Sequence, residues 1–272
     1  MTAETVVITG AGGMGSAVAR RIGSGRRIVL ADAAPEHLDR AVAALEAEGH
    51  DVSGRVVDVG DQESVLALAA YAAAEGRLAA VVHTAGVSAA TASIPQILRV
   101  DLAGTAYLID AFAAVAVPGT AVVCVASMAG HYARLSAAEE RALASEPASA
   151  LLTLDVVRSA GPDAVSAYIL AKRANQVRAS AAALAYSRRG ARINTLSPGV
   201  ISTPMARAEQ QSASGDHMMA MLEACGAGRT GTPAEVAEAV AFLAGPDARY
   251  ITGTDLLLDG GQAAWIRWHR PS

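Results

Sequence analysis

The chain has 272 residues, of which 52% are hydrophobic and 18% are charged, and its net charge is −4. This composition excludes an intrinsically disordered chain and supplies enough apolar residues for a large core. The basic residues are scattered, so we expect neither a nucleic-acid partner nor a polybasic membrane anchor. No basic N-terminal region or long apolar run indicates a signal peptide or membrane span, which predicts a cytoplasmic protein. Two distant cysteines, Cys124 and Cys225, argue against a disulfide framework or a thiolate metal site.

Short runs rich in Val, Ile and Leu alternate with segments of helical periodicity along the chain. Near-continuous apolar runs are typical of parallel strands covered on both faces. The alternation predicts one α/β domain over residues 1–272, with a doubly wound parallel sheet of about seven strands. The expected strands are Thr5–Thr9, Arg27–Asp32, Gly54–Val59, Leu78–Thr84, Thr120–Ser127, Arg192–Leu196 and Thr254–Leu258. The expected helices are Met14–Gly23, Pro35–Glu48, Glu63–Glu75, Leu98–Val115, Ala164–Arg188 and Ala234–Ala244.

Two long segments interrupt this alternation, and long irregular segments in compact domains are often functional. Residues 130–163 look helical, because Ser136 and Glu139 have the spacing of a capping box. Residues 203–229 contain four of the seven methionines, which either line an apolar ligand site or fill gaps in the core. These four are Met205, Met218, Met219 and Met221.

A glycine-rich loop joins the first expected strand to the first helix and fits the pattern G-x-G-x-x-G. Such a loop lets a pyrophosphate approach the backbone at a helix N-terminus. Asp32 follows 22 residues after Gly10, close to the spacing expected for an acid that binds the adenosine ribose. Because this carboxylate would repel a 2′-phosphate, NAD is favoured over NADP; the alternative is an exposed aspartate at a strand end. The loop residues are Gly10, Gly12, Gly13, Met14 and Gly15.

Tyr168 and Lys172 are four residues apart in an expected helix and therefore share one face. Lys172 is the only lysine in a chain with 21 arginines, which indicates a chemical requirement for an ammonium group. At about 4 Å and an effective dielectric constant of about 20, the ammonium would lower the phenol pKa by roughly three units. Tyr168 could then act as a general acid or base; the alternative is a surface pair.

Ser127 stands at the carboxyl end of the fifth expected strand, where doubly wound sheets bind their ligands. Its hydroxyl could hold a substrate oxygen beside Tyr168, although a strand-terminal serine is commonly a turn residue. His83 and His131 lack a partner at metal-ligand spacing, so we expect structural roles for them. Asp58, after the third expected strand, would contact the adenine amine or cap a solvated turn.

Together these motifs resemble the short-chain dehydrogenase/reductase family over nearly the whole chain. The resemblance implies a single-domain Rossmann fold and hydride transfer to or from a nicotinamide. It further implies that Tyr168 donates or accepts the proton, Lys172 binds the nicotinamide ribose and Ser127 orients the carbonyl. Other family motifs are His83-Thr84-Ala85-Gly86, Asn194 and Asp259-Gly260-Gly261. Further cofactor contacts implied are Asp58, Val59, Ala85, Gly86, Pro198, Gly199 and Thr203.

Three features depart from the family pattern. The glycine loop is one residue shorter than usual, and Asp101 stands where an asparagine usually supports a proton relay through water. A carboxylate accepts a hydrogen bond from water but donates one only when protonated; we hypothesise that Asp101 still holds the water. The insertion 130–163 resembles that of the bacterial 3α-hydroxysteroid dehydrogenase/carbonyl reductase subgroup, where it covers a usual subunit interface. We therefore expect a homodimer or homotetramer, with the dimer favoured.

We expect the substrate to be a lipophilic secondary alcohol or ketone, with a steroid- or terpenoid-like framework. This expectation rests on the methionine-rich segment and on the lack of an arginine cluster for phosphates. The aromatic tail around Trp265 and Trp268 would be an interface, a core plug or a substrate contact. The alternative function is a non-catalytic regulator that senses the dinucleotide on the same fold.

Overall fold

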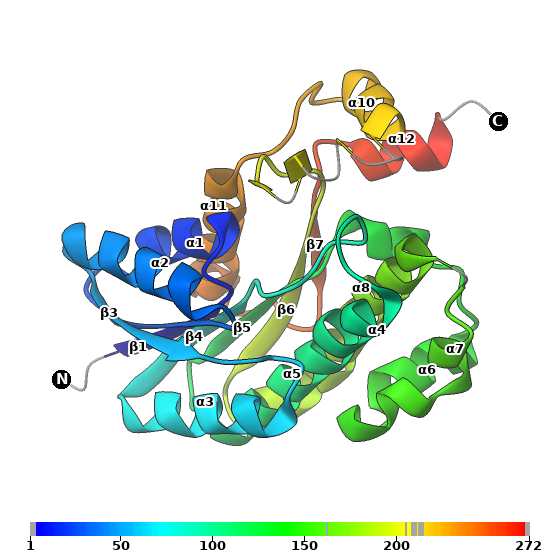
Figure 1. Cartoon of the computed structure of the whole chain (residues 1–272). Coiled ribbons are helices and arrows are strands. Elements are labelled where there is room, and N and C mark those ends of the chain that lie inside the picture. Colours follow the sequence, from blue (N-terminus) through cyan, green and yellow to red (C-terminus); the bar gives the residue numbers. More distant parts are fainter. Residues whose placement is uncertain (1–3, 162, 205, 208–210, 212–214, 270–272) are drawn as a thin grey trace.

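A seven-stranded parallel sheet lies at the centre of the computed structural model, which describes residues 4–161, 163–204, 206–207, 211 and 215–269. The strand order is β3-β2-β1-β4-β5-β6-β7, so the chain changes direction across the sheet between β1 and β4 (Figure 1). This confirms the predicted doubly wound fold. The strands are β1 Glu4–Thr9, β2 Arg27–Asp32, β3 Asp51–Val56, β4 Arg77–His83, β5 Ala121–Val125, β6 Arg192–Pro198 and β7 Asp255–Leu258.

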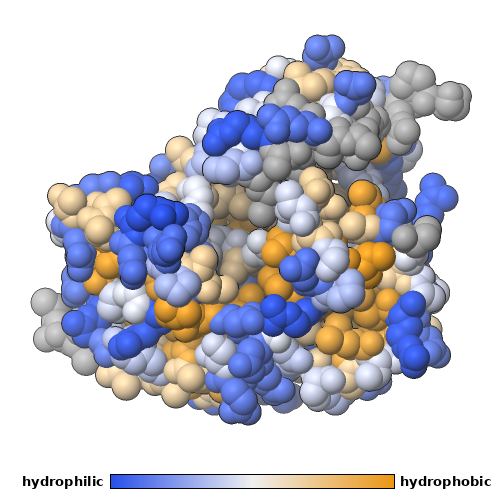
Figure 2. Space-filling view, in the orientation of Figure 1, coloured by the Kyte–Doolittle hydropathy of each residue, from blue (hydrophilic) through white to orange (hydrophobic). Residues whose placement is uncertain are grey.

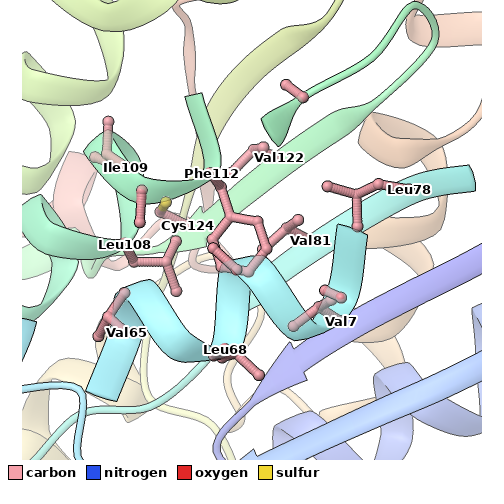
Figure 3. Packing of buried hydrophobic residues seen from close by; sticks show 14 of the residues in the cluster. Val7, Val65, Leu68, Leu78, Val81, Leu108, Ile109, Phe112, Val122 and Cys124 are labelled. Atoms are coloured by element: carbon pink, nitrogen blue, oxygen red, sulfur yellow. The ribbon is translucent and has the colours of Figure 1, made fainter. Parts of the chain in front are cut away.

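Helices cover both faces of the sheet because successive strand residues point to opposite sides. Val7 of β1 packs with α3 (Gln62–Ala74), α5 (Thr105–Val115) and α8 (Ala164–Ser187), whereas Val6 and Ile8 face the other layer. Figure 3 shows the side chain of Phe112 from α5 among residues of the strands and of α3. The helices of the second layer are α1 Gly13–Ile22, α2 Pro35–Ala47 and α11 Pro233–Ala244.

The third strand is displaced from its predicted position. β3 spans Asp51–Val56 rather than Gly54–Val59, and most of its residues are exposed because it lies at the edge of the sheet. Val57 and Val59 are buried, but they follow the strand instead of belonging to it. The apolar residues that predicted a strand lie partly in the buried turn after β3. The first half of β3 is mostly polar because an edge strand needs no apolar pattern, so the prediction did not include it.

The predicted helix Leu98–Val115 divides into two segments, and a short helix precedes them. A short α4 (Ile94–Ile97) leads into a π-helical segment, η1 (Leu98–Gly104), and α5 follows. π-Helical turns are rare and often occur at functional sites. Here the segment carries Asp101, whose side chain is fully buried.

The insertion 130–163 is helical, as predicted, and covers the outer side of α8. Its elements are the 3₁₀ turns η2 (Met128–Tyr132) and η3 (Ala148–Thr153) and the helices α6 (Ala137–Ser145) and α7 (Asp155–Arg158). Ser136 and Glu139 form the predicted capping box. Arg178 of α8 donates to the Glu146 carbonyl (2.8 Å) and pairs with Asp110 of α5 (3.0 Å). Arg178 thus joins the end of α6 to α8 and joins α8 to α5.

Two helices, α10 (Gly215–Ala224) and α12 (Gln262–Trp268), form a cap that stands beyond the sheet (Figure 1). Met218 and Met221 pack with Leu222 against Trp265 and Ile266. These two methionines therefore fill the interior of the cap, and Trp265 acts as the core plug. Met219 is partly exposed, Trp268 is largely exposed and Met205 lies outside the described residues. None of the helices in the described part of the chain is long and apolar enough to cross a bilayer.

Candidate active site

The glycine-rich loop joins β1 to α1 at the carboxyl edge of the sheet. Gly10 has φ +88°, and a side chain there would come within 2.7 Å of the Thr84 hydroxyl. At Gly15 an added Cβ would collide with the Gly10 carbonyl. Both positions therefore require glycine for the fold itself.

Gly12 and Gly13 are different, because their positions have room for a side chain. An added Cβ would have no neighbour nearer than 4.0 Å at Gly12 and 3.6 Å at Gly13. No side chain caps α1 at Gly12. The missing side chains thus leave an open cradle at a helix N-terminus, and this arrangement fits a pyrophosphate.

Asp32, at the end of β2, is tied to the glycine loop. Its carboxylate accepts hydrogen bonds from the Ala11 N–H (2.8 Å) and the Ala34 N–H (2.9 Å). The Nδ1 atom of His37 lies 3.6 Å from Oδ2. The carboxylate therefore both anchors the loop and retains lone pairs for further donors, such as ribose hydroxyls.

Asp58 caps its own turn and pairs with a neighbouring helix segment. Its oxygens accept from the Gly60 N–H (2.9 Å) and from Arg99 of η1 (2.7 Å). The predicted turn role is therefore present, and contact with an adenine remains a prediction. Val59 is buried beside Gly104, where an added Cβ would lie 2.8 Å from the Val59 carbonyl.

The lone lysine is the centre of a buried polar cluster. Lys172 is only 5% exposed, and its Nζ lies 3.6 Å from Oδ1 of Asp101 and 5.1 Å from the ring centre of Tyr168. Tyr168 is partly buried on the same side of α8. The structure thus brings together three of the four predicted catalytic residues.

The Asp101 carboxylate reaches Lys172 past Gly86, in the loop after β4. Oδ1 accepts a hydrogen bond from the Val87 N–H (3.0 Å). An added Cβ at Gly86 would lie 2.7 Å from Oδ1 and 3.4 Å from Nζ. Glycine at this position therefore makes room for the ion pair. Oδ2 is buried and has no hydrogen-bond partner among the described residues.

Burial and charge act in opposite directions on this pair. Burial alone lowers the pKa of Lys172, but the Asp101 carboxylate and the Tyr168 phenolate raise that pKa above its usual value. Burial raises the pKa of Asp101, and the Lys172 ammonium opposes that change. The ammonium is therefore held in its charged form by its two neighbours.

Ser127 lies two residues beyond β5, at the start of η2. Its Oγ accepts from the Ala129 N–H (3.1 Å), so the turn role of this serine is present. A hydroxyl that accepts one hydrogen bond still has its own proton to donate. Because η2 packs against α8, Ser127 and Tyr168 lie on neighbouring elements.

The segment after β6 is held against the base of α12. Gly199 lies where a side chain would contact Gln262 and Asp259 at 2.6 and 2.9 Å. The Val200 N–H donates to Oε1 of Gln262 (3.0 Å). Thr203 is buried, and its methyl group is the nearest neighbour of an added Cβ at Gly13. The predicted Pro198–Thr203 segment therefore borders the glycine loop, and Figure 2 shows a hollow between the cap and the domain body.

Side chains that no sequence motif predicted support Ser127. Gln176 donates to the Ser127 carbonyl (3.3 Å) and to the Ser197 hydroxyl (2.9 Å). Ser197 donates to Asp255 (2.7 Å), which also pairs with His131 (2.8 Å). Gln176 follows Lys172 by four residues, so the helical spacing that linked Tyr168 to Lys172 could have identified it.

His83 has the structural role that was expected. Its Nδ1 lies 2.6 Å from the Thr9 hydroxyl and its Nε2 lies 3.0 Å from the Thr105 hydroxyl. Thr105 donates its own proton to the Asp101 carbonyl (2.9 Å), so His83 Nε2 carries the hydrogen. Burial, with a smaller contribution from Lys172, lowers the pKa of His83 to about 3. Within the described residues, no three potential metal ligands form a cluster.

Comparisons with known proteins agree with this geometry. The family profile described as "short chain dehydrogenase" matches residues 4–139, and that described as "Enoyl-(Acyl carrier protein) reductase" matches residues 132–263. A short-chain dehydrogenase/reductase of Alternaria brassicicola, bsc3, is 36% identical over 98% of both chains. The chain belongs to the short-chain dehydrogenase/reductase family. It is therefore an NAD(P)-dependent oxidoreductase that acts on an alcohol or a ketone.

Two further proteins are similar over most of the chain. A galactitol 2-dehydrogenase (L-tagatose-forming) of Cereibacter sphaeroides is 32% identical and covers 95% of this chain and 94% of its own. The 3-alpha-hydroxysteroid dehydrogenase/carbonyl reductase of Comamonas testosteroni is 30% identical and covers 82% and 91%. Membership of that subgroup stays a prediction. A solved short-chain dehydrogenase/reductase of Serratia marcescens shares the fold, with a TM-score of 0.74 at 22% identity over 96% and 98% of the chains.

The low pKa of His83 predicts a loss of stability in mild acid. The unfolded chain binds a proton at this residue below about pH 6.5, whereas the folded protein does not do so until about pH 3. The contribution of His83 to the free energy of unfolding is therefore fully present above pH 6.5. It falls by about 2 kcal/mol as the pH drops to about 5. Urea unfolding across this range should show a smaller decline for His83→Gln than for wild type.

The exposed residue His269 provides the control for this measurement. His269→Gln should retain the wild-type pH dependence. Equal declines in wild type and His83→Gln would show that His83 does not resist protonation in the folded protein.

Proposed function

We propose that the enzyme transfers a hydride between NAD and a lipophilic secondary alcohol or ketone, with Tyr168 as the general acid/base. The observation that carries this proposal is the burial of the only lysine beside Tyr168. A fixed positive charge there stabilises the phenolate, and a nearby ammonium lowers the pKa of a phenol. Ser127 and Asp101 complete the set of proposed functional residues.

In the oxidation direction, the Tyr168 phenolate accepts the proton of the substrate hydroxyl. Ser127 donates its hydroxyl proton to the substrate oxygen and so orients it beside Tyr168. The ammonium of Lys172 stabilises the phenolate before transfer and binds ribose hydroxyls. A bound nicotinamide dinucleotide supplies the hydride acceptor or donor. Asp101 holds the water of the proton relay through Oδ2, and the buried position of that oxygen supports this role.

The preference for NAD rests on the charge of Asp32. A 2′-phosphate placed beside this carboxylate would be repelled. Arg26 and Arg27 are occupied elsewhere, because Arg26 pairs with Glu4 (2.8 Å) and Arg27 pairs with Glu75. Arg55 of the neighbouring strand β3 lies over the Tyr71 ring. Arg27 begins β2 and Arg26 precedes it, whereas Asp32 ends the strand, so neither is placed to neutralise a phosphate at Asp32.

The cap supports an apolar substrate. Met128 and Val200, which directly follow Ser127 and Gly199, pack against the methionines of the cap. The surfaces that border the proposed reaction site are therefore continuous with an apolar interior. The relative named for 3-alpha-hydroxysteroids favours the same substrate class, and the relative named for galactitol favours a polyol.

The insertion supports a homodimer over a homotetramer. Leu143, Leu151 and Val157 of the insertion pack against α8, and Arg178 holds the end of α6. The middle of α8 is thus covered by the chain itself, although Leu184 near its end is 61% exposed. We propose that this cover removes one surface on which a second copy could pack.

Tyr168→Phe should reduce kcat/KM by at least about 100-fold, because it removes the group that transfers the proton. We expect the Kd for NAD to change by less than about twofold, since the phenol is not a phosphate contact. The assay follows nicotinamide reduction with a panel of steroid and terpenoid alcohols, sugar alcohols, sugar phosphates and acyl thioesters. The exposed Tyr250→Phe is the control. Turnover confined to the polar substrates or thioesters would contradict the lipophilic assignment.

Asp32→Asn removes the charge but keeps an oxygen that can accept from the Ala11 N–H. It should improve NADP binding relative to NAD by about tenfold, because the repulsion of the 2′-phosphate is lost. Calorimetric titration of both cofactors measures this ratio, and Asp39→Asn on the exposed side of α2 is the control. Tighter binding of NADP than of NAD by wild type would contradict the role of Asp32.

Sedimentation equilibrium should show a species of two chains. The covered face of α8 leaves one fewer surface for assembly, so we expect no concentration-dependent step to four chains. A stable tetramer would contradict the proposal.

A further inference from the structure

Asp101 is placed so that its charge acts on the lysine. Its side chain is fully buried in the π-helical segment η1, and Oδ1 lies 3.6 Å from Nζ of Lys172. The Val87 N–H holds the same oxygen, and Gly86 leaves the space between the two charges open. Within the described residues, Asp101 is the carboxylate paired with Lys172. This carboxylate replaces a neutral amide of the family pattern, so it adds a charge to the site.

The other titratable groups around Lys172 contribute no charge at neutral pH. His83 of β4 is neutral because its pKa is about 3. Its Nε2 contacts the Thr105 hydroxyl, which donates to the backbone carbonyl of Asp101. Burial raises the pKa of Cys124 on β5 to about 12, so its thiol is also neutral. Of these groups around Lys172, the charged ones at neutral pH are therefore Lys172 and Asp101.

We propose that Asp101 is a positioning residue that pairs with the Lys172 ammonium and offsets part of its field at the Tyr168 hydroxyl. Asp101 thereby fixes the pH range in which Tyr168 accepts a proton. This inference rests on the proposed function, since it assigns a role to the same site.

The sign of the effect follows from the net charge of the pair. Ionised Asp101 and Lys172 together carry no net charge beside the phenol. In Asp101→Asn, a protonated Lys172 leaves a net charge of +1, and a deprotonated Lys172 leaves none. The field at Tyr168 thus becomes more positive or stays the same, and it never becomes more negative. A phenolate at Tyr168 offsets the free-energy cost of burying the Lys172 ammonium. In Asp101→Asn we therefore expect Lys172 to stay protonated and the pKa of Tyr168 to fall.

The direct test is the ionisation of Tyr168 in the free protein. Phenolate absorbance is titrated for wild type and for Asp101→Asn, and the same titration with Tyr168→Phe added to each is subtracted. The Tyr168 transition should move to lower pH by about one unit in Asp101→Asn. A transition at the same or a higher pH would overturn the proposal. The pH limb of alcohol oxidation should move in the same direction.

Asp110→Asn is the matched control, because Asp110 lies on α5 and pairs with Arg178 away from the site. It removes the same charge from the chain and should leave the Tyr168 transition in place. Circular dichroism melting shows whether each variant is folded. A shift of equal size in Asp110→Asn would indicate a general effect of net charge and would also overturn the proposal.

The single lysine permits a second test on the wild-type protein. Lysine labelled with ¹³C at Cε gives one signal, which reports the charge of Lys172. We expect the ammonium form throughout the neutral range and a further step at the pH where Tyr168 ionises. A neutral amine near pH 7 would refute the ion pair, even if Asp101→Asn fails to fold. Neither titration uses cofactor or substrate, so a negative result is distinct from failure of the Tyr168→Phe kinetic test.

Discussion

The burial of one ammonium group is the constraint on which the site depends. A lysine that is taken out of water stays charged only when anionic groups or acceptors surround it. Lys172 meets this requirement through Asp101 and Tyr168, which come from η1 and from its own helix. The irregular helix segment and Gly86 both serve this contact, because one brings the carboxylate in and the other makes space for it. The local backbone therefore accommodates a buried charge, and this charge lies beside the Tyr168 phenol.

The sheet places this charge next to the dinucleotide cradle. β1 and β4 are neighbours, so Gly10 and the segment Thr84–Gly86 lie together at the carboxyl edge. Ligands of doubly wound sheets bind where the strand order changes direction, which here is between these two strands. Gly10 and Gly15 permit the close approach of backbone segments, whereas Gly12 and Gly13 leave room for the ligand. Two pairs of glycines in one loop thus have different physical functions.

Much of the fold and the centre of the site could be predicted from the sequence, for identifiable reasons. Buried parallel strands have continuous apolar runs, and the Tyr168–Lys172 spacing has a direct meaning on a helix. β3 was misplaced because an edge strand needs no apolar pattern. The bonds from Asp32 to the loop and from Gln176 to Ser127 depend on tertiary contacts. The spacing of Gln176 from Lys172 indicates its helix face, but the sequence does not show that its partner is the Ser127 carbonyl, nor that the Ala11 N–H is the partner of Asp32.

The insertion and the proposed reaction site are connected through α8. Arg173 pairs with Glu140 of α6 and donates to Oε1 of Gln176 (3.2 Å). The amide nitrogen of Gln176 in turn donates to the Ser127 carbonyl, so a continuous set of polar contacts joins the inserted helix to the Ser127 turn. Gly130 lies directly against Gln176, where an added Cβ would approach within 2.8 Å. The insertion therefore does more than cover the outer face of α8. It also fixes the amide that supports the proposed substrate-orienting serine.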